Sequence, residues 1–317
     1  MSITPRGMSI QEAYRTYTDE NFLVNRKYQR KLVWTVDEKA FLIDSILNGL
    51  PIPLILLAQT KEGKLEIIDG LQRLNAIFSY IENRYSVNEL FFDIEQSARA
   101  KQESEAGKFE HQTDKDILLP ADKCANILDY QLAVTIYPSA EEEATTEIFG
   151  RINSGGKQLS PQEKRQAGVL DNFADVVRKL SSEIRGDSSK DILELSEMPQ
   201  ISIDSNRENI GYGLTAEEIF WCSHGVVWKS QLRDSEDEEI IADIVSTVLK
   251  NEPQPISRQL FNTMYDEGSD ENNELNTLLA QYGTDRLMHE IKVTFSIVKQ
   301  IFESQDTTVK NVVNPGS

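Results

Sequence analysis

The stretch Ile68-Asp69-Gly70-Leu71-Gln72-Arg73 joins the end of an expected strand to the start of an expected helix. Residues 65–68 have strand composition. Beyond the turn, apolar side chains recur at helical spacing, at Leu74, Ile77, Phe78 and Ile81. An acid, a bare backbone, an amide and a guanidinium therefore fall within one strand-turn-helix unit, which we predict to be the functional centre.

This turn has the chemistry of a phosphate site. Gly70 lets a ligand approach the main chain, the start of a helix favours anions, and Arg73 can bind a phosphate bidentately. Asp69 can activate water or bind Mg²⁺. A structural reading is equally open on these residues alone, in which Asp69 caps the helix and Arg73 forms a structural ion pair.

The segments before the turn indicate an α+β fold. Thr35 and Glu38 form a capping-box pattern that starts a helix, and Gly49 ends it. Residues 54–58 form a continuous apolar run of strand length, and residues 61–64 form a hairpin-like turn into the next strand. Two short strands therefore precede the acid-glycine turn.

Downstream, the pattern predicts one more strand and then mainly helices. Alternating apolar residues predict a strand over 130–137, and residues 141–149 have a helical pattern. Ser160, Pro161 and Glu163 occupy the N-cap, N1 and N3 positions of the next helix. From about residue 165 onward the pattern is mainly helical.

We place a domain boundary near residue 180, between a first domain over residues 1–180 and a helical region over residues 181–317. Within the first domain, residues near 95–120 are charged and poor in large apolar side chains. We expect them to form an exposed insertion with no rigid role.

The charge distribution excludes a protein whose whole surface binds nucleic acid. The chain has 317 residues, 39% of them hydrophobic, and a formal net charge of −19. Residues 1–90 hold 11 basic and 11 acidic side chains, so 22 of the 33 basic and 41 of the 52 acidic residues lie downstream. Phosphate neutralisation needs clustered Lys and Arg. A local cluster at Arg26, Lys27, Arg30 and Lys31 predicts a local anion or DNA contact at most.

Cysteine, histidine and hydropathy patterns exclude further classes. Cys124 and Cys222 lie far apart and outside any metal-binding spacing, so neither a disulfide framework nor a structural zinc site is indicated. The three histidines lack metalloprotease or His-Asn-His nuclease spacing. No apolar run is long enough to span a bilayer, and residues 1–10 lack a signal-peptide pattern, so we expect a cytoplasmic location.

Two more segments combine polar and flexible residues. Tyr28-Gln29-Arg30 followed by Trp34 can stack on a base and bind its edge or phosphate, or can be a core aromatic residue beside a surface arginine. The loop Phe149-Gly150-Arg151-Ile152-Asn153-Ser154-Gly155-Gly156 can form an anion-binding nest of backbone N–H groups, or can be a plain turn between helices. No Gly-Lys-Ser/Thr follows it, which excludes a Walker loop.

Taken in order along the chain, these motifs resemble the family called domain of unknown function 262. The set consists of Tyr28-Gln29-Arg30 with Trp34, the segment Ser45-Ile46-Leu47-Asn48-Gly49-Leu50-Pro51-Ile52-Pro53, the turn at residues 68–73, and the loop at residues 149–156 with Leu159 and Glu163. This family is the ParB/sulfiredoxin-like domain at the N-terminus of GmrSD-type modification-dependent restriction systems. The resemblance covers about residues 10–220.

The resemblance implies a fold, a ligand and a set of residues. The fold is a small mixed β-sheet with helices, ParB/sulfiredoxin-like, followed by a mainly helical C-terminal region. The family's Asp-Gly-Gln-Gln-Arg signature is associated with nucleoside triphosphate hydrolysis that controls a nuclease in bacterial defence against phage. The ligand is thus GTP, ATP or CTP, with Mg²⁺ as a companion ion. Carried over, the catalytic set is Asp69, Gln72 and Arg73, and the nucleotide-binding set is Tyr28, Gln29, Arg30, Gly70, Arg151, Asn153, Ser154 and Gly155.

The chain departs from the family pattern at two places. Leu71 replaces the first Gln of the signature, and if that amide orients the attacking water, binding survives here while hydrolysis is weak or absent. Many relatives also carry a His-Asn-His nuclease domain, whereas residues 220–317 contain only His224 and His289. The chain therefore resembles a regulatory part whose effector, such as a nuclease, is a separate protein, and it is compatible with a homo-oligomer.

Three functions stay open at this point. The first is a nucleotide-binding sensor subunit, with or without hydrolysis, in an anti-phage or restriction system. The second is a DNA-binding or DNA-nicking ParB-like protein that uses the same pocket on a phosphodiester. The third is a non-catalytic module that binds a partner through its acidic C-terminal face.

Overall fold

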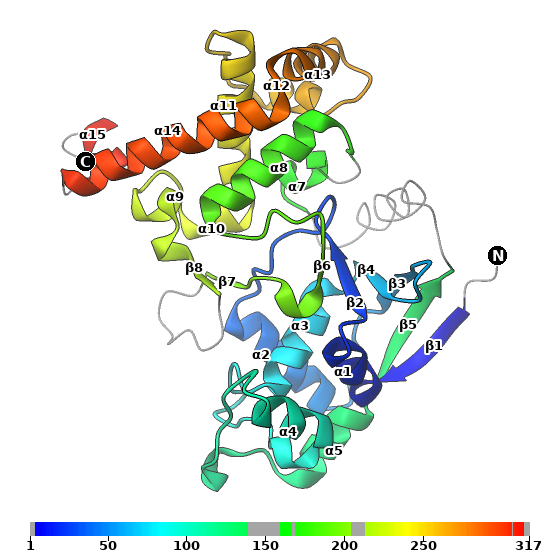
Figure 1. Ribbon diagram of the computed structural model, residues 1–317. Coiled ribbons are helices and arrows are strands. Elements are labelled where there is room, and N and C mark those ends of the chain that lie inside the picture. The colour runs from blue at the N-terminus through cyan, green and yellow to red at the C-terminus, as the bar shows by residue number, and fades with distance from the viewer. Residues whose placement is uncertain (1–3, 139–158, 167–168, 204–212, 306, 314–317) are drawn as a thin grey trace. The chain divides into compact units, whose positions relative to one another are not determined.

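The computed structural model describes residues 4–138, 159–166, 169–203, 213–305 and 307–313 (Figure 1). These residues belong to two compact units, each described by itself below. Unit 1 comprises Met1–Asn25, Lys31–Ile148 and Ile192–Gly213, and unit 2 comprises Arg26–Arg30, Phe149–Asp191 and Leu214–Ser317. The units do not follow one cut in the sequence, and the boundary predicted near residue 180 falls inside a helix of unit 2.

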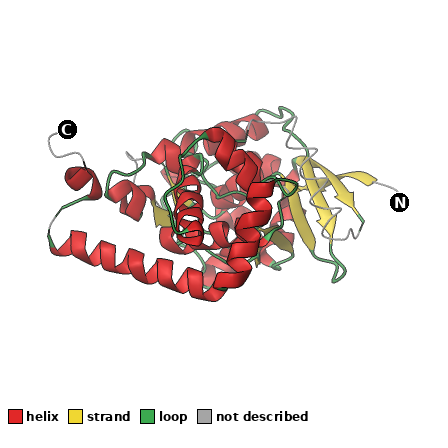
Figure 2. Cartoon of the chain, turned by 90° about the horizontal axis from the view of Figure 1, so that it is seen from above, coloured by secondary structure: helices red, strands yellow, loops and turns green. Residues whose placement is uncertain are grey.

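Unit 1 is built on a mixed sheet, whose strands are yellow in Figure 2. The strand order is β1-β5-β3-β4-β2-β6. The pairs β3–β5 and β2–β4 are parallel, and the pairs β1–β5, β3–β4 and β2–β6 are antiparallel. The strands are β1 (Thr4–Ser9), β2 (Phe22–Asn25), β3 (Ile55–Gln59), β4 (Leu65–Asp69), β5 (Gln131–Tyr137) and β6 (Ile192–Glu194). The predicted α+β class with a small mixed sheet is confirmed.

The helices of unit 1 include the two predicted from the sequence before and after the acid-glycine turn at residues 68–73. α2 (Val36–Leu47) begins at the expected capping box, in which the Thr35 hydroxyl accepts from the Glu38 N–H at 3.2 Å and the Glu38 carboxylate accepts from the Thr35 N–H at 3.0 Å. The other helices are α1 (Ile10–Thr18), α3 (Leu71–Ile81), α4 (Ala98–Glu105) and α5 (Ala121–Asp129), with 3-10 turns at Ile94–Gln96, Lys115–Ile117 and Leu195–Glu197 and a short strand β7 (Ile201–Ser202).

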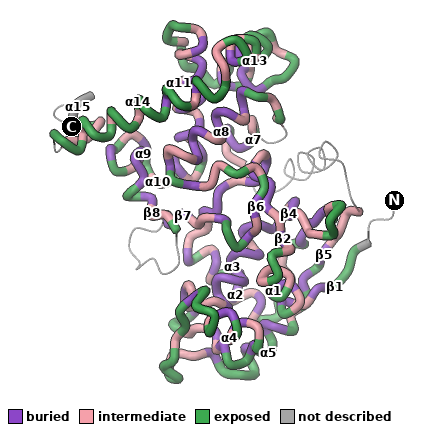
Figure 3. Tube along the Cα trace, viewed as in Figure 1, coloured by how far each residue is buried: buried purple, intermediate pink, exposed green. Residues whose placement is uncertain are grey.

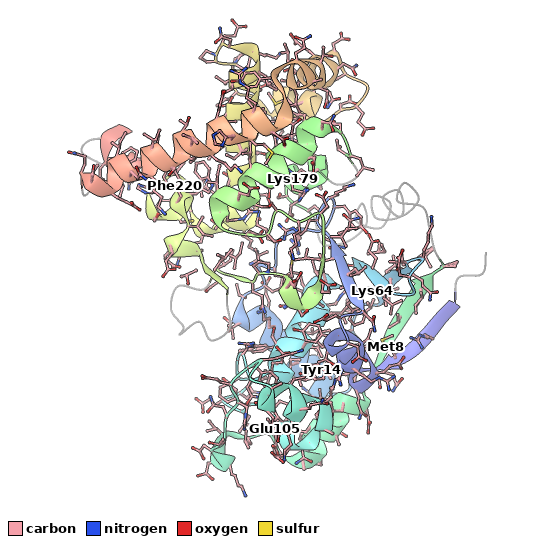
Figure 4. All side chains as sticks on the ribbon, in the orientation of Figure 1. Met8, Tyr14, Lys64, Glu105, Lys179 and Phe220 are labelled. Atoms are coloured by element: carbon pink, nitrogen blue, oxygen red, sulfur yellow. The ribbon has the colours of Figure 1, made fainter. Side chains whose placement is uncertain are left out.

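α3 runs through the core of unit 1 and is buried along most of its length (Figure 3). Aromatic rings from α1 pack on Phe78 of this helix, with the Tyr17 ring stacked at 4.6 Å and the Tyr14 ring tilted at 5.9 Å between centroids. Tyr14 and the core residue Met8 are labelled in Figure 4. Such aromatic pairs add to the free energy gained by burying their area, so the start of α3 lies on a firmly packed helix.

The charged segment near residues 95–120 is more ordered than its composition suggests. It contains α4, and Ala100 and Phe109 belong to the hydrophobic core. The carboxylate of Glu103, which is nine-tenths buried, pairs with Lys108 at 2.7 Å and with Arg99 at 3.6 Å. Core side chains and one buried carboxylate thus hold a segment that we expected to have no rigid role.

Unit 2 is mainly helical, as predicted for the C-terminal part of the chain. α8, α11, α13 and α14 supply much of its core, through side chains such as Phe173, Val177, Ile241, Leu275 and Leu287. The helices are α7 (Pro161–Gln166), α8 (Asn172–Arg185), α9 (Phe220–Ser223), α10 (Lys229–Arg233), α11 (Glu236–Lys250), α12 (Arg258–Met264), α13 (Asp270–Tyr282), α14 (Thr284–Ser304) and α15 (Val309–Val313), with β8 (Leu214–Thr215) and a 3-10 turn at Ala216–Glu218. The helix predicted over 141–149 lies outside the described residues.

A buried charge cluster fixes residue 26 in unit 2. The Arg26 guanidinium donates to the Asp187 carboxylate at 2.7 Å, and Arg185 contacts the same carboxylate at 3.3 Å and also pairs with Asp237. Burial by itself raises the pKa of Asp187, but the two arginines hold that pKa below its usual value. The short segment between β2 and residue 31 is therefore anchored among helices of unit 2.

Candidate functional site

The predicted acid-glycine turn lies at the end of β4 and the start of α3, in unit 1. Asp69 is the last residue of β4 and pairs with Leu56 of β3. Gly70 is the N-cap of α3 with φ of +105°, and a Cβ added there would lie 2.5 Å from Cδ1 of Ile55. The glycine is therefore required by backbone conformation and packing, whether or not a ligand approaches it.

Asp69 and Arg73 form an ion pair across the first turn of α3. Nη2 of Arg73 lies 2.6 Å from Oδ2 of Asp69, with the arginine side chain 12% exposed and the aspartate side chain 37% exposed. Asp69 does not cap the helix, because the N-cap is Gly70 and no side chain caps it. The structural reading is thus correct for the ion pair and wrong for the cap.

The start of α3 combines features that suit an anion. The first hydrogen bond of the helix runs from the Leu74 N–H to the Gly70 carbonyl, so the N–H groups of the three preceding residues have no partner within the helix. Such N–H groups and the helix dipole favour negative charge. Arg73 stands on the same turn, and only its Nη2 is engaged by Asp69.

The Gln72 side chain is turned to the backbone of residues 31–34. Its Oε1 accepts from the N–H groups of Val33 and Trp34, both at 3.2 Å, and its Nε2 donates to the Lys31 carbonyl at 2.7 Å. Gln72 is 7% exposed. This predicted catalytic residue is thus a neighbour of Arg73 in the sequence, but its amide is hydrogen bonded to the protein backbone.

Leu71 faces the core of unit 1. It is 3% exposed and belongs to the same hydrophobic cluster as Leu74 and Ile77. The departure from the Asp-Gly-Gln-Gln-Arg signature therefore falls on a side chain that packs inside the protein.

The predicted nucleotide-binding residues Tyr28, Gln29 and Arg30 belong to unit 2. Tyr28 and Gln29 are buried, and Nη1 of Arg30 lies 3.5 Å from Oε1 of Glu163. Glu163 also completes the capping box that starts α7, where its Oε2 accepts from the Ser160 N–H at 2.9 Å. Unit 2 thus brings Arg30 to the helix that directly follows the glycine-rich loop.

The remaining predicted residues of that loop lie outside the described residues, namely Arg151, Asn153, Ser154 and Gly155. The pairing of Arg30 with Glu163 could not be predicted from the sequence, because Glu163 already has a role in the capping box of its own helix.

The predicted basic cluster is not an exposed patch. Arg26 and Lys31 are 4% and 2% exposed, and they belong to different units. Arg30 is partly covered and faces Glu163. A DNA backbone cannot reach the two buried cations, so these four residues do not form the continuous basic track that DNA binding requires.

A cavity of about 170 Å³ lies in unit 2, at the first turns of α8. Lys27, Asn172, Asp175, Arg178 and Asp191 are among its lining residues. Arg178 pairs with Asp175 at 2.7 Å and also with Asp191, and Lys179, labelled in Figure 4, pairs with Asp175 at 2.7 Å. The charges around this cavity are therefore largely balanced within the protein.

Two classes of feature are absent from the described part of the chain. It contains no group of three or more His, Cys, Asp and Glu side chains that could hold a metal ion. None of its helices is both long enough and apolar enough to cross a membrane.

Comparison with known proteins gives one family. Residues 10–170 match the N-terminal domain of the GmrSD restriction endonuclease, a match that includes the whole β4–α3 turn, Tyr28, Gln29, Arg30 and the glycine-rich loop. No curated protein matches the chain. The match covers half of the chain, and its description points to a component of a restriction system. This chain therefore belongs to the family of the GmrSD restriction endonuclease N-terminal domain.

Proposed function

We propose that this chain is the nucleotide-binding regulatory subunit of a bacterial restriction system, and that the phosphates of a nucleoside triphosphate bind at the β4–α3 turn. The observation that carries the proposal is the Asp69–Arg73 pair at a helix start that no side chain caps. The family match supports the restriction context.

The residues of the turn have separate roles in this proposal. The Arg73 guanidinium, with Nε and Nη1 outside the Asp69 contact, binds phosphate oxygens, and the first N–H groups of α3 add further donors. Asp69 holds Arg73 in place through Oδ2, and its Oδ1 is the candidate ligand for a Mg²⁺ ion carried by the nucleotide or the acceptor for a water proton. Where hydrolysis occurs, Asp69 is the base that we propose.

The family resemblance adds the Tyr28-Gln29-Arg30 motif and the glycine-rich loop to the residues that we propose for nucleotide binding. Within unit 2, the contact between Arg30 and Glu163 supports a role shared by the motif and the helix that follows the loop. The effector of the proposed subunit is a separate nuclease, which co-purification with a neighbouring gene product would test.

Calorimetric titration with GTP, ATP and CTP, each with and without Mg²⁺, tests the binding proposal. We expect one of them to bind, and Arg73→Ala to raise its Kd about 10- to 100-fold, because hydrogen bonds to charged groups contribute about 1.5–3 kcal/mol. Arg286→Ala is the matched control, since Arg286 forms the same kind of i,i+4 ion pair with Glu290 at 2.8 Å on α14. Absence of binding to all three nucleotides would refute the proposal.

A further inference from the structure

We infer that Gln72 is a positioning residue, which acts on the nucleotide site through the backbone of residues 31–34 and not by touching the ligand. The inference rests on the proposed function for its effect on binding. The geometry that carries it lies entirely within unit 1.

The Gln72 amide has little capacity left for a ligand. A primary amide offers an oxygen with two lone pairs and two N–H donors. Both lone pairs are used by the N–H groups of Val33 and Trp34, and one donor is used by the Lys31 carbonyl. With the residue 7% exposed, a single N–H remains, which is a poor basis for orienting a water or a phosphate.

The three contacts join two parts of the chain that are far apart in sequence. Gln72 lies between 38 and 41 residues from its partners, so it connects α3 to a segment with no regular structure of its own except one bridge at Leu32. A further contact with that segment comes from the Ile201 N–H, which donates to the Leu32 carbonyl at 2.9 Å. Residues 31–34 are thus clamped by hydrogen bonds to both Gln72 and β7.

The clamped segment directly follows the Tyr28-Gln29-Arg30 motif. Lys31 is the residue at which the chain re-enters unit 1, and the hydrogen bond from Gln72 to its carbonyl holds this residue on the helix that carries Arg73. Within unit 1, Gln72 therefore positions the backbone of residues 31–34 against the helix that carries the predicted phosphate-binding Arg73.

The test uses hydrogen exchange of the full-length protein together with nucleotide titration. Gln72→Met removes all three hydrogen bonds while keeping an unbranched side chain. We expect the Val33 and Trp34 amides to exchange about tenfold faster, as a lost hydrogen bond of ordinary strength predicts, and nucleotide binding to weaken. Arg73→Met, one residue on, is the matched control, which weakens binding but leaves exchange at Val33 and Trp34 unchanged.

A second variant guards against a folding defect. Gln72→Glu keeps an acceptor for the Val33 and Trp34 N–H groups and loses the donor to Lys31, so we expect these two amides to stay protected. Fast exchange of both amides in this variant would contradict the assigned contacts. Weaker binding by Gln72→Met with unchanged exchange would show that Gln72 touches the ligand, and faster exchange with unchanged binding would show that the clamp does not serve the site. Either result overturns the inference, whereas absence of binding by the wild type refutes the proposed function and leaves the clamp measurable by exchange alone.

Discussion

Replacing Leu71 by the glutamine of the family signature should destabilise the protein without producing faster nucleotide turnover. Leu71 is 3% exposed and packs in the core of unit 1. Full burial of a leucine side chain contributes about 1.5–3 kcal/mol, and a buried amide without partners costs about 1–3 kcal/mol. Leu71→Gln should therefore lower the free energy of unfolding by about 3–5 kcal/mol.

Urea unfolding monitored by circular dichroism measures this loss, with nucleotide turnover assayed on the same preparations. Leu71→Met is the control, because a swap that conserves volume in a core usually costs less than about 1.5 kcal/mol. We expect Leu71→Gln to shift the urea midpoint strongly and turnover not to rise. A Leu71→Gln protein as stable as the wild type, with faster hydrolysis, would show that position 71 faces the ligand and that the core assignment is wrong.

Three other perturbations test the structure. Asp187→Asn removes the charge of the carboxylate that pairs with the buried Arg26 guanidinium and should cost about 3–5 kcal/mol in urea unfolding; a loss under about 1 kcal/mol would argue against burial of the pair. Burial raises the pKa of Glu82 to about 7 in the folded protein. The folded protein therefore has the full benefit of a protonated Glu82 below the pKa of the unfolded state, and it loses this stabilisation as pH rises from about 4.5 through 7. Over that pH range, the free energy of unfolding of Glu82→Gln should rise by about 3 kcal/mol relative to that of the wild type. If the two free energies changed in parallel with pH, the prediction would be wrong. Gly70→Ala should cost about 1–3 kcal/mol from its positive φ and its clash with Ile55, and less in an Ile55→Val background, which lacks Cδ1; equal costs in the two backgrounds would exclude the clash.

Local patterns predicted the elements around the site. Three of them depend on a few neighbouring residues: the capping box of Thr35 and Glu38, the strands β3 and β4 on both sides of the hairpin turn, and the start of α3. The structure has all three where the sequence indicates. β1 and β6 were not predicted. Both are edge strands of the sheet, and β6 has only three residues, so their formation depends on partners more than 100 residues away.

The partners of the site residues were less predictable than the elements. The contact of Gln72 with the backbone of residues 31–34 has no signature in sequence, because any backbone N–H can meet an amide oxygen. Apolar residues such as Ala100 and Phe109 likewise did not predict an ordered structure for the charged segment. The ion pairs of the buried Glu103 with Arg99 and Lys108 also hold this segment, and the sequence did not indicate them. What the sequence could not supply in each case was the identity of a distant neighbour.

Helix geometry explains why three consecutive signature residues have three different environments. Successive side chains on an α-helix point about 100° apart, so Leu71 enters the core, Gln72 meets the segment after the Tyr28-Gln29-Arg30 motif, and Arg73 returns over the first turn to Asp69. Of the three side chains, Arg73 is the one that contacts the acid of the turn. A change at position 71 should therefore be seen first in stability, a change at position 72 in the order of residues 31–34, and a change at position 73 in ligand affinity. In our proposal, the three signature residues therefore serve packing, positioning and binding in turn, and variants of neighbouring residues can measure each role separately.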